Sequence, residues 1–518
     1  MTVWGTEVRR DASGVLVYER GPTTFAELVD GTAVWTDRTF LVHGARRISY
    51  DDFRAAVTAA RTTLRELGIE PGHRVVVFGY NSPEWIVALW ATWLYGAVPV
   101  LANRWWSPAE IDHAVDVLAP AHVLADVDLD VGVPCTPLGE LRAAFDAPRD
   151  ADPPDAPTSP ADAVALVLFT SGSSGMPKAV ELSRRAVIAN QHDIFARNGR
   201  FPHLLDADSP QATSLATTPM FHVGGLSSLL THFLTGGKIV LTQGRFDAGQ
   251  ILELIERERI QIWGAVPTMA VRLLAHPDFE ARDLSSLKSW PLGGAPVSID
   301  LLDRIRAKLP NLRRRGLSNT WGMTEAGGFL TAADARDLAV HPGTVGRPYP
   351  VVELRIADPD ADGVGEVLAR SPTVMNGYAG MPDDRTVDAE GWLHSGDLGH
   401  LNDDGYLFID GRAKDVVIRG GENIACPHVE SAIATHPDVV EVAALGVPHP
   451  DLGEELVAVV VHRADGPAPT PDGLRAHVAG TLSYFAVPTR WEIRTAPLPT
   501  LAGEKVDKRS LARLFADG

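Results

Sequence analysis

The chain has 518 residues, 45% hydrophobic and 22% charged, a composition typical of a globular protein long enough for two to four domains. Its formal net charge of −19 argues against nucleic acid or an anionic membrane as a partner, because both require a basic surface. Two cysteines, Cys135 and Cys426, are too few for a disulfide framework and are expected to be thiols in a reducing compartment.

No membrane or secretion signal is evident in the sequence. Charged residues stand at positions 7, 9, 10 and 11, where a signal peptide would need an apolar run. The longest uncharged run, residues 85–103, is interrupted by Gly96 and Pro99 and lacks the ~20 apolar residues that a membrane span needs. We therefore expect a buried helix and strand there, no membrane span, and a cytoplasmic protein.

Between residues 48 and 125 the periodicity alternates between helix and strand. Helices are predicted over 51–67, from 82 to 95, and from the capping box at Ser107 to about Pro120. The predicted strands between and after them cover residues 74–78, 97–101 and 122–125. This alternation predicts βαβ units and a mostly parallel sheet that is covered on both faces.

A second alternating block extends from residue 183 to about 317. Its predicted strands are 212–217, 238–242, 261–266 and 289–292. After Gly343 shorter strand-like runs at 351–356, 365–369 and 406–409 predict a smaller β-rich subdomain. From residue 410 the pattern is α+β, with helices near 427–435 and from 471, and strands near 439–447, 456–461 and 491–494.

The predicted fold is therefore α/β. A large N-terminal domain over residues 1–409 combines two parallel-sheet halves with the β-rich subdomain. A small, mobile α+β domain covers residues 410–518, with its hinge at Asp410.

A loop rich in glycine and hydroxyl side chains follows the apolar run 163–169. From Leu168 to Lys178 it reads Leu-Phe-Thr-Ser-Gly-Ser-Ser-Gly-Met-Pro-Lys. Its backbone N–H groups, hydroxyls and ammonium group are suited to an anion such as phosphate. The spacing excludes a Walker A loop, and six small residues alone would equally fit a flexible surface turn.

This loop resembles the signature Thr-Ser-Gly-Ser-Ser-Gly-x-Pro-Lys of the adenylate-forming superfamily, which includes acyl-CoA synthetases, luciferases and peptide-synthetase adenylation domains. Further segments match in family order as far as residue 508, so the resemblance covers essentially the whole chain. It implies that the loop binds the phosphates of ATP. The residues implied are Thr170, Ser171, Gly172, Ser173, Ser174, Gly175 and Lys178.

Two segments resemble the walls of the family's acid and adenine pockets. The first reads Phe221-His222-Val223-Gly224-Gly225 and resembles a family segment whose histidine lies beside the carboxylate substrate. Without that resemblance, an isolated histidine is more often structural. The other segment resembles the border of the adenine and acyl pocket, although alone it would fit an ordinary turn between strand and helix. It consists of Gly293, Gly294, Ala295 and Pro296.

The most specific match reads Thr320-Trp321-Gly322-Met323-Thr324-Glu325 and is similar to the family pattern aromatic-Gly-x-Thr-Glu. The resemblance implies that the ring of Trp321 stacks on adenine, that Thr324 binds phosphate, and that Glu325 with Thr170 holds Mg²⁺, a cation that prefers oxygen ligands. Trp321 stands where tyrosine is usual. We therefore expect the stacking to remain and the hydrogen bond of the phenol to be lost.

Charged and glycine-rich segments further on resemble the ribose and pantetheine sites. Asp397 is implied to accept hydrogen bonds from both ribose hydroxyls, and Arg412 also to contact the ribose; alone, each segment would fit a solvated surface. The loop from Arg419 resembles the one that lines the pantetheine tunnel after the small domain rotates. Its implied residues are Gly420, Gly421 and Glu422.

Near the C-terminus, Lys505 aligns with the catalytic lysine of the family. Glycine normally stands directly before this lysine, but here Glu504 occupies that position and Gly503 comes one residue earlier, so the geometry of this loop is in question. Lys508 is the neighbouring basic residue. The resemblance implies that Lys505 contacts the carboxylate and the negative charge that develops as the carboxylate attacks the α-phosphate.

The implied reaction is ATP-dependent activation of a carboxylic acid to acyl-AMP with release of pyrophosphate, followed by transfer to the thiol of coenzyme A. ATP, Mg²⁺ and CoA are the implied cofactors. A carrier-protein thiol, an amine, or nitrite as in diazotase-like relatives could use the same site. A catalytically weak binding or regulatory protein on this scaffold is the alternative from another class.

The acid is not readable from the sequence, and neither is the choice between monomer and homodimer. The expected pocket walls are small, which is compatible with a medium or bulky hydrophobic acid. They comprise His222, Val223, residues 264–266, Gly293, Gly294, Gly322, Met323 and Gly328.

Overall fold

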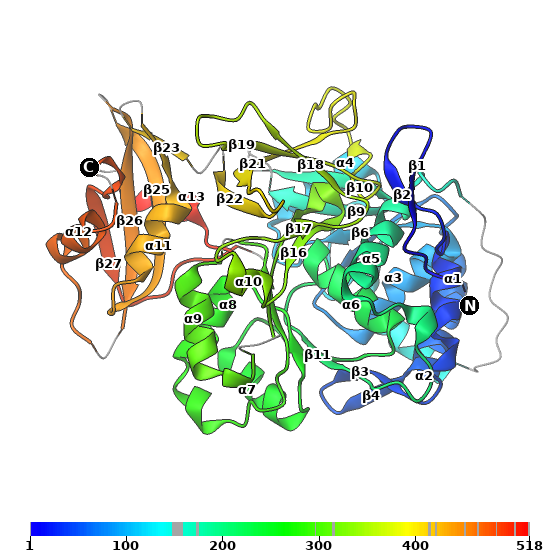
Figure 1. Ribbon diagram of the computed structural model, residues 1–518. Helices are drawn as coiled ribbons and strands as arrows, with labels where there is room; N and C mark the ends of the chain where they lie inside the picture. Colours follow the sequence, from blue (N-terminus) through cyan, green and yellow to red (C-terminus); the bar gives the residue numbers. More distant parts are fainter. Residues whose placement is uncertain are drawn as a thin grey trace.

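The computed structural model describes most of the chain. The described ranges are 2–147, 159–171, 176–295, 297–312, 316–412, 416–419, 422–449, 452–463, 466–482, 484–501 and 504–515. They form a large α/β body and, beside it, a small α+β body that contains the C-terminal elements (Figure 1). The predicted fold class is confirmed. Among the described residues, no helix has the length and apolar character needed to cross a membrane.

The first half of the large body is built on a seven-stranded sheet. In spatial order its strands are β20 (Gly377–Tyr378), β10 (Pro177–Ser183), β9 (Val164–Ser171), β6 (Val98–Ala102), β5 (Arg74–Phe78), β7 (His122–Ala125) and β8 (Cys135–Pro137). The strands from β9 to β8 are parallel, whereas β10 and β20 add an antiparallel edge. The predicted βαβ alternation is confirmed.

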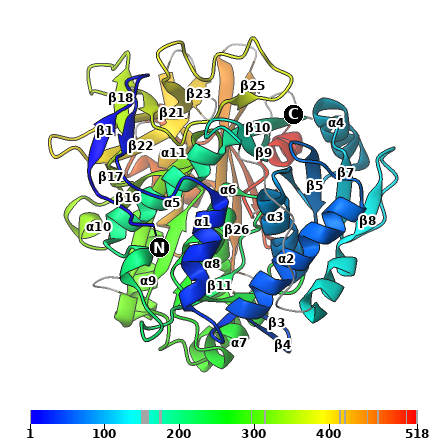
Figure 2. The same ribbon diagram turned by 90° about the vertical axis from the view of Figure 1, so that its right-hand side faces the viewer.

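The helices of this half begin and end at residues that the sequence makes recognisable. They are α1 (Phe25–Asp30), α2 (Tyr50–Glu66), α3 (Pro83–Tyr95), α4 (Pro108–Leu118) and α5 (Arg184–Asn198). The hydroxyl of Ser82 caps α3, Pro83 occupies its first turn, and Gly96 ends it with a φ of +82°. Figure 2 shows α1, α2 and α3 together on the face opposite the small body.

The second half has a five-stranded sheet in the order β13 (Ile262–Trp263), β11 (Thr213–Ala216), β12 (Lys238–Leu241), β3 (Thr39–His43) and β4 (Arg46–Ser49). Its helices are α6 (Val223–Leu234), α7 (Ala248–Arg257), α8 (Pro267–Ala275) and α9 (Ile299–Lys308). The strand predicted over 261–266 is shorter than expected, and only an isolated bridge from Ala265 to Leu292 continues its line. Strands β3 and β4 of this sheet come from before residue 50, a placement that the sequence did not predict.

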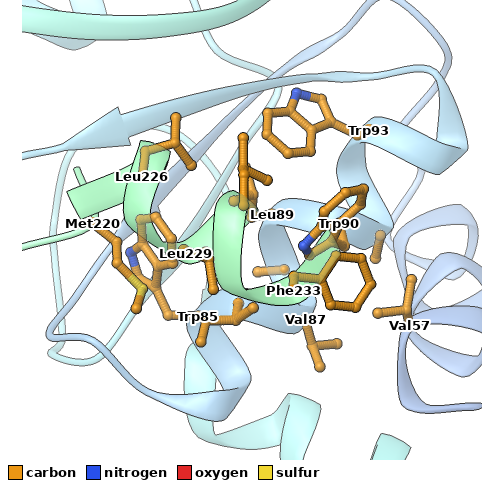
Figure 3. Packing of buried hydrophobic residues seen from close by; sticks show 14 of the residues in the cluster. Val57, Trp85, Val87, Leu89, Trp90, Trp93, Met220, Leu226, Leu229 and Phe233 are labelled. Carbon is orange, nitrogen blue, oxygen red and sulfur yellow. The ribbon is translucent and has the colours of Figure 1, made fainter. Parts of the chain in front are cut away.

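Helices α3 and α6 pack together in the centre of the large body (Figure 3). Trp85, Trp90 and Phe233 are each 0% exposed, and the rings of Trp90 and Phe233 lie 4.8 Å apart. Because α3 carries apolar residues on all of its faces, nearly all of its residues are buried and only Leu94 is half-buried, as the sequence predicted for this run.

Two further sheets complete the large body. One is mixed and contains β14 (Trp290–Gly293), β15 (Leu317–Met323), β16 (Gly328–Ala333) and β17 (Arg347–Pro348), with β14 parallel to β15. The other contains β18 (Glu353–Ala357), β19 (Gly365–Arg370), β21 (Leu393–Leu401) and β22 (Leu407–Arg412). Strand β21 was not predicted, because serine, aspartate and glycine occupy several of its buried positions and hide the alternation.

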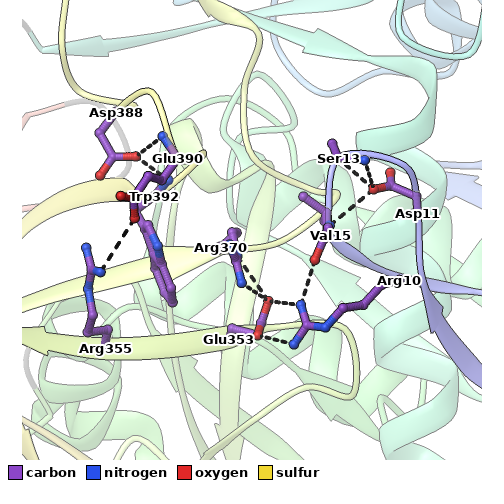
Figure 4. A network of polar contacts seen from close by, with 11 residues as sticks. Arg10, Asp11, Ser13, Val15, Glu353, Arg355, Arg370, Asp388, Glu390 and Trp392 are labelled. Carbon is purple, nitrogen blue, oxygen red and sulfur yellow. Dashed lines mark hydrogen bonds and ion pairs between the residues drawn. The ribbon is translucent and has the colours of Figure 1, made fainter.

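An N-terminal hairpin of β1 (Val8–Arg10) and β2 (Leu16–Tyr18) is tied to this last sheet by charge (Figure 4). Glu353 accepts from Arg10 at 2.7 Å and lies 3.0 Å from Arg370. The guanidinium groups of Arg355 and Arg370 lie 4.5 and 4.8 Å from the ring centroid of Trp392.

The small body has a five-stranded sheet of β24 (Glu422–Ala425), β23 (Val416–Arg419), β26 (Gly453–His462), β25 (Val439–His449) and β27 (Arg490–Arg494). Helices α11 (Cys426–Ala434), α12 (Pro471–Ala479) and α13 (Lys508–Ala512) lie against it. Asp410, the predicted hinge, lies within β22, and this strand pairs with β21 of the large body. Neither cysteine is in a disulfide.

Candidate active site

The described part of the phosphate loop lies on the paired strands β9 and β10. Thr170 is opposite Lys178 in this pair. The ammonium of Lys178 lies 4.4 Å from the ring centroid of Tyr378 and 3.9 Å from a carboxylate oxygen of Asp384. The predicted residues Gly172, Ser173, Ser174 and Gly175, and the side chain of Ser171, lie outside the described part of the structure.

Tyr378 links this loop to the predicted metal ligand. Its hydroxyl donates to Oε1 of Glu325 at 2.8 Å. Burial and the negative charge of Glu325 raise the pKa of Tyr378, so its phenol remains a hydrogen-bond donor. The sequence analysis did not identify Tyr378. Only the pairing of β20 with β10 brings it to the site, and no local motif marks that pairing.

Glu325 follows β15 in a short 3-10 turn, Thr324–Ala326. Among the described residues, no group of three or more His, Cys, Asp or Glu could hold a metal ion. One carboxylate fits Mg²⁺, which commonly takes one or two protein carboxylates and completes its shell with water and substrate phosphates. The donor set is therefore compatible with the predicted Mg²⁺, with Thr170 as the second predicted ligand.

Asp397 lies between two hydrogen-bond donors. Its Oδ2 accepts from the indole N–H of Trp321 at 2.7 Å, and its Oδ1 accepts from Nε of Arg412 at 2.7 Å. Asp397 is only 4% exposed, and β21 pairs with β22 so that Asp397 stands opposite Arg412. The sequence predicted the loss of the tyrosine hydrogen bond; in the structure, the indole supplies a hydrogen bond of its own.

Glycines allow close approach between β14, β15 and β16. A Cβ on Gly293 would lie 2.5 Å from Oγ1 of Thr320, and one on Gly322 would lie 2.1 Å from the carbonyl oxygen of Gly328. Larger residues at these positions would therefore push the strands apart. Ala295 follows in the turn and is half-buried, Met323 ends β15, and Pro296 is not among the described residues.

His222 is the residue before α6, and its backbone is extended. Its ring lies 4.7 Å from that of the buried Phe221, which in turn contacts Trp105 at 5.5 Å. Asn81 holds this turn, accepting from the N–H of Met220 at 2.9 Å and donating to the carbonyl of Thr218 at 3.0 Å. Asn81 is a further residue that the sequence analysis missed.

Lys505 reaches the same site from the small body. A Cβ on Gly294 would lie 3.9 Å from Cε of Lys505 and 3.6 Å from Cγ1 of Val266. Surrounding protein and the charge of Arg412 lower the pKa of Lys505, although Glu325 and Asp397 oppose this shift and the residue as a whole is exposed. Lys505 therefore lies close enough to interact electrostatically with Glu325, the predicted Mg²⁺ ligand, and Asp397, the predicted ribose ligand.

The predicted pantetheine loop is only partly described. Glu422 begins β24 and pairs with Arg419 at the end of β23, whereas Gly420 and Gly421 lie outside the described ranges. The arginine side chain donates to the carbonyl of Phe485 at 2.8 Å within the small body.

Comparison with known proteins bears on this site. Residues 30–379 match the model of the AMP-binding enzyme family, and residues 428–502 match that of the AMP-binding enzyme C-terminal domain. The feruloyl-CoA synthase of an Amycolatopsis species is 34% identical over 494 residues, covering 92% of this chain and 96% of that protein. The indoleacetate–CoA ligase of Aromatoleum aromaticum is 34% identical, covering 80% and 83%. The 4-coumarate–CoA ligase 5 of Oryza sativa subsp. japonica is 32% identical, covering 87% and 86%.

Solved structures show the same similarity over nearly the whole chain. ATP-bound MatB from Rhodopseudomonas palustris has a TM-score of 0.81 and 28% identity, covering 95% of this chain and 98% of that one. The amide bond synthetase McbA from Marinactinospora thermotolerans has a TM-score of 0.78 and 27% identity, covering 95% and 99%.

Proposed function

The chain belongs to the AMP-binding enzyme family as an AMP-forming acid–CoA ligase. We propose that its substrate is an aromatic acid, in which a short chain joins the ring to the carboxylate. The enzyme activates a carboxylic acid to acyl-AMP and transfers the acyl group to CoA, using ATP and Mg²⁺. The acid class is supported by the relatives named for ferulate, 4-coumarate and indoleacetate.

One structural observation carries this proposal: small residues adjoin the turn that contacts Lys505. A Cβ placed on Gly294 would lie 3.9 Å from Cε of Lys505 and 3.6 Å from Cγ1 of Val266, and a Cβ placed on Gly264 would meet no atom within 4 Å. An acid whose carboxylate pairs with Lys505 could therefore lay a flat ring along Val266 and Gly264. Burying such a ring contributes roughly 25 cal/mol per Å² of apolar surface.

The two carboxylates of the site are assigned different roles. Glu325, held by Tyr378, would bind Mg²⁺ on the phosphates, with Thr170, Thr324 and Lys178 as phosphate ligands. Positive charge around the phosphates would stabilise the pyrophosphate as it leaves. When bound, Mg²⁺ would supply charge neutralisation of these phosphates.

The remaining partners would hold the nucleoside. Asp397 has further lone pairs for the ribose hydroxyls besides those used by Trp321 and Arg412, and the ring of Trp321 would lie against adenine. Gly294, which is exposed in the turn after β14, would leave the backbone accessible to a flat base. His222 would lie beside the carboxylate of the acid.

We assign the two half-reactions to two orientations of the small domain. In the orientation described here, Lys505 is at the site, which suits attack of the acid carboxylate on the α-phosphate. Rotation about a hinge at Asp410, between domains 1–409 and 410–518, would withdraw Lys505 and bring Gly420, Gly421 and Glu422 to the acyl-AMP. Because β22 ends at Arg412 and β23 begins at Val416, the hinge would lie at this crossing.

A pyrophosphate-release screen tests the acid class. Ferulate, 4-coumarate and indoleacetate would be compared with octanoate and acetate, each with and without CoA. We expect the aryl acids to have the highest kcat/KM, and CoA thioesters to accumulate only with CoA. Preference for octanoate or acetate would contradict the proposal, and product formation only with amines would indicate amide synthesis instead.

A substitution at Gly264 gives a matched structural test. Gly264→Leu should reduce kcat/KM for ferulate by about tenfold or more while retaining activity on a smaller acid, because the new side chain would occupy the space beside Val266. An equal loss for large and small acids would instead indicate a general distortion of the site.

A cytoplasmic location is also proposed. Cys135 and Cys426 do not form a disulfide, and Cys135 is partly exposed, which is compatible with a reducing compartment. Detection of the protein in a fraction other than the cytoplasm would contradict it.

A further inference from the structure

One arginine of the large body contacts three parts of the small body. Arg272 lies on α8, and its Nη1 is 2.6 Å from Oε2 of Glu504. Its Nε is 3.2 Å from Oε1 of Glu441 on β25, and its Nη2 donates to the carbonyl of Leu498 at 3.2 Å. The other oxygen of Glu441 accepts from the N–H of Leu498 at 2.9 Å, so these groups form one network.

Glu504 occupies a backbone conformation that favours glycine. Its φ is +60°, in the left-handed region, where a side chain is disfavoured. Its carboxylate nevertheless has two partners, Arg272 and the hydroxyl of Thr500 at 3.2 Å. The side chain thus makes contacts that a glycine could not make.

The backbone hydrogen bonds around Glu504 also fix the backbone position of Lys505. The N–H of Glu504 donates to the carbonyl of Leu501 at 3.0 Å, and the N–H of Leu501 donates to the carbonyl of Lys505 at 2.6 Å. A contact that holds Glu504 against α8 therefore holds the backbone of Lys505 as well. Val266 and Lys505 are both neighbours of Gly294, and Val266 directly precedes α8.

We propose that Arg272 and Glu504 are positioning residues that hold the small domain in the orientation with Lys505 at the site. The contact joins the two bodies, so it must break when the small domain rotates. This inference rests on the role proposed for Lys505. The added element is the charge contact between Arg272 and Glu504, the residue before Lys505. This contact favours adenylation over thioester formation.

The burial of the network gives the contact its strength. The side chains of Arg272, Glu504 and Glu441 are 23%, 22% and 8% exposed, so solvent and salt screen them less than a surface pair. Without the arginine, the carboxylates of Glu441 and Glu504 would lose their shared positive partner. Their repulsion would then disfavour this orientation.

The test separates the two half-reactions. Adenylation is measured as a single-turnover burst of pyrophosphate with acid and ATP. Thioester formation is measured from supplied acyl-AMP and CoA. We expect Arg272→Ala to slow adenylation about 10- to 100-fold with little change in the KM for ATP, and to leave thioester formation equal or faster. Arg272→Lys, which retains the charge, should recover part of the adenylation rate.

Two further variants control for backbone and surface effects. Glu504→Gly restores the favoured backbone but removes the carboxylate, so it should also slow adenylation, and the Arg272→Ala/Glu504→Gly double variant should be little slower than either single variant. Arg257→Ala removes the pairs with Glu253 on the neighbouring α7 and with Glu258 just after it, which lie outside the network of Arg272, and should change neither half-reaction.

An unchanged adenylation rate in Arg272→Ala, or an equal loss in both half-reactions, would overturn the inference. Thermal unfolding of each variant shows whether a loss comes from misfolding, and Arg272→Lys then provides the folded comparison. The measurements use whichever acid supports pyrophosphate release. Failure of aryl acids as substrates would therefore count against the proposed function and not against this contact.

Discussion

Two junctions in this molecule are built by different means. In the centre of the large body, α3 meets α6 through fully buried side chains such as Trp90 and Phe233 (Figure 3). Between the large and small bodies, Arg272 contacts Glu504 and Glu441 through charged side chains, of which Arg272 and Glu504 are partly exposed. The first contact excludes water over a wide apolar area, and the second depends on a few polar atoms.

This difference teaches which parts of the molecule can move. Separating α3 from α6 would expose large aromatic surfaces at roughly 25 cal/mol per Å², so this junction is lost only when the protein unfolds. Charged side chains regain water when they separate, so a charged junction can open at much lower free energy. A domain that must rotate during each turnover is suited to the second kind of contact.

The largest expected effect concerns the apolar junction. Trp90→Ala should lower the free energy of unfolding of the large body by about 3–5 kcal/mol, because it removes a buried ring and leaves a cavity. Chemical denaturation followed by fluorescence checks this value. Leu204→Ala, at a position 66% exposed, is the control and should change stability by less than about 0.5 kcal/mol. A comparable loss of stability in both variants would contradict the role assigned to the apolar junction.

At the charged junction, the chemistry is more sensitive than the fold. Lys505→Ala should slow adenylation by roughly 10²-fold or more, the effect expected for one electrostatic donor, while thioester formation from acyl-AMP survives. Separate assays of the two half-reactions check this. Lys508→Ala serves as the control, because Lys508 pairs with Glu430 at 2.8 Å within the small body. Equal losses in both half-reactions would exclude the assigned role.

A buried carboxyl in the large body, Asp193, allows the effect of an apolar interior on stability to be tested by varying the pH. Burial raises the pKa of Asp193 to about 8, and its Oδ1 accepts from the hydroxyl of Tyr18 at 2.7 Å. The unfolded chain releases this proton near pH 4, whereas the folded chain retains it up to about pH 8. Between these values the folded state binds more protons, so the contribution of Asp193 to stability falls as pH rises.

Asp193→Asn should remove this dependence. We expect the variant to be about 1–3 kcal/mol more stable than the unmodified protein at pH 8 and similar to it near pH 4.5, because a neutral amide can replace the protonated acid. Denaturation curves at several pH values check the trend. A stability difference independent of pH, or one that grows toward acid pH, would contradict a raised pKa.

The smallest expected effect concerns the hydrogen bond at the edge of the ATP site. Trp321→Phe keeps an aromatic ring but removes the N–H that Asp397 accepts, so the KM for ATP should rise roughly tenfold or less. Trp321→Tyr, the residue usual in the family, should be closer to the unmodified enzyme if its hydroxyl reaches Asp397. Steady-state kinetics with ATP as the varied substrate distinguish these outcomes, and an unchanged KM in Trp321→Phe would show that the bond is dispensable.

The local pattern of the sequence determined most of the secondary structure and the chemical types at the site. Short continuous apolar runs marked β5 and β7, and Ser82 with Pro83 and Gly96 marked the two ends of α3. The motif with Trp321 and Glu325, the acid Asp397 and the lysine at 505 could be recognised from residue type and order. These signals are local, since each needs only residues within a few positions of one another.

Tertiary structure alone decided the contacts between distant segments. It placed β3 beside β12, set the hydroxyl of Tyr378 on Glu325, and joined Trp321 to Asp397. Glu504 was noticed as a departure from the family, but its partner Arg272 lies 232 positions earlier in the chain. Hydrophobic periodicity reports which face of an element is buried and carries no record of the element that buries it. The choice of partner depends on the packing of the whole chain, so the contact between Arg272 and Glu504 could be identified only from the structure.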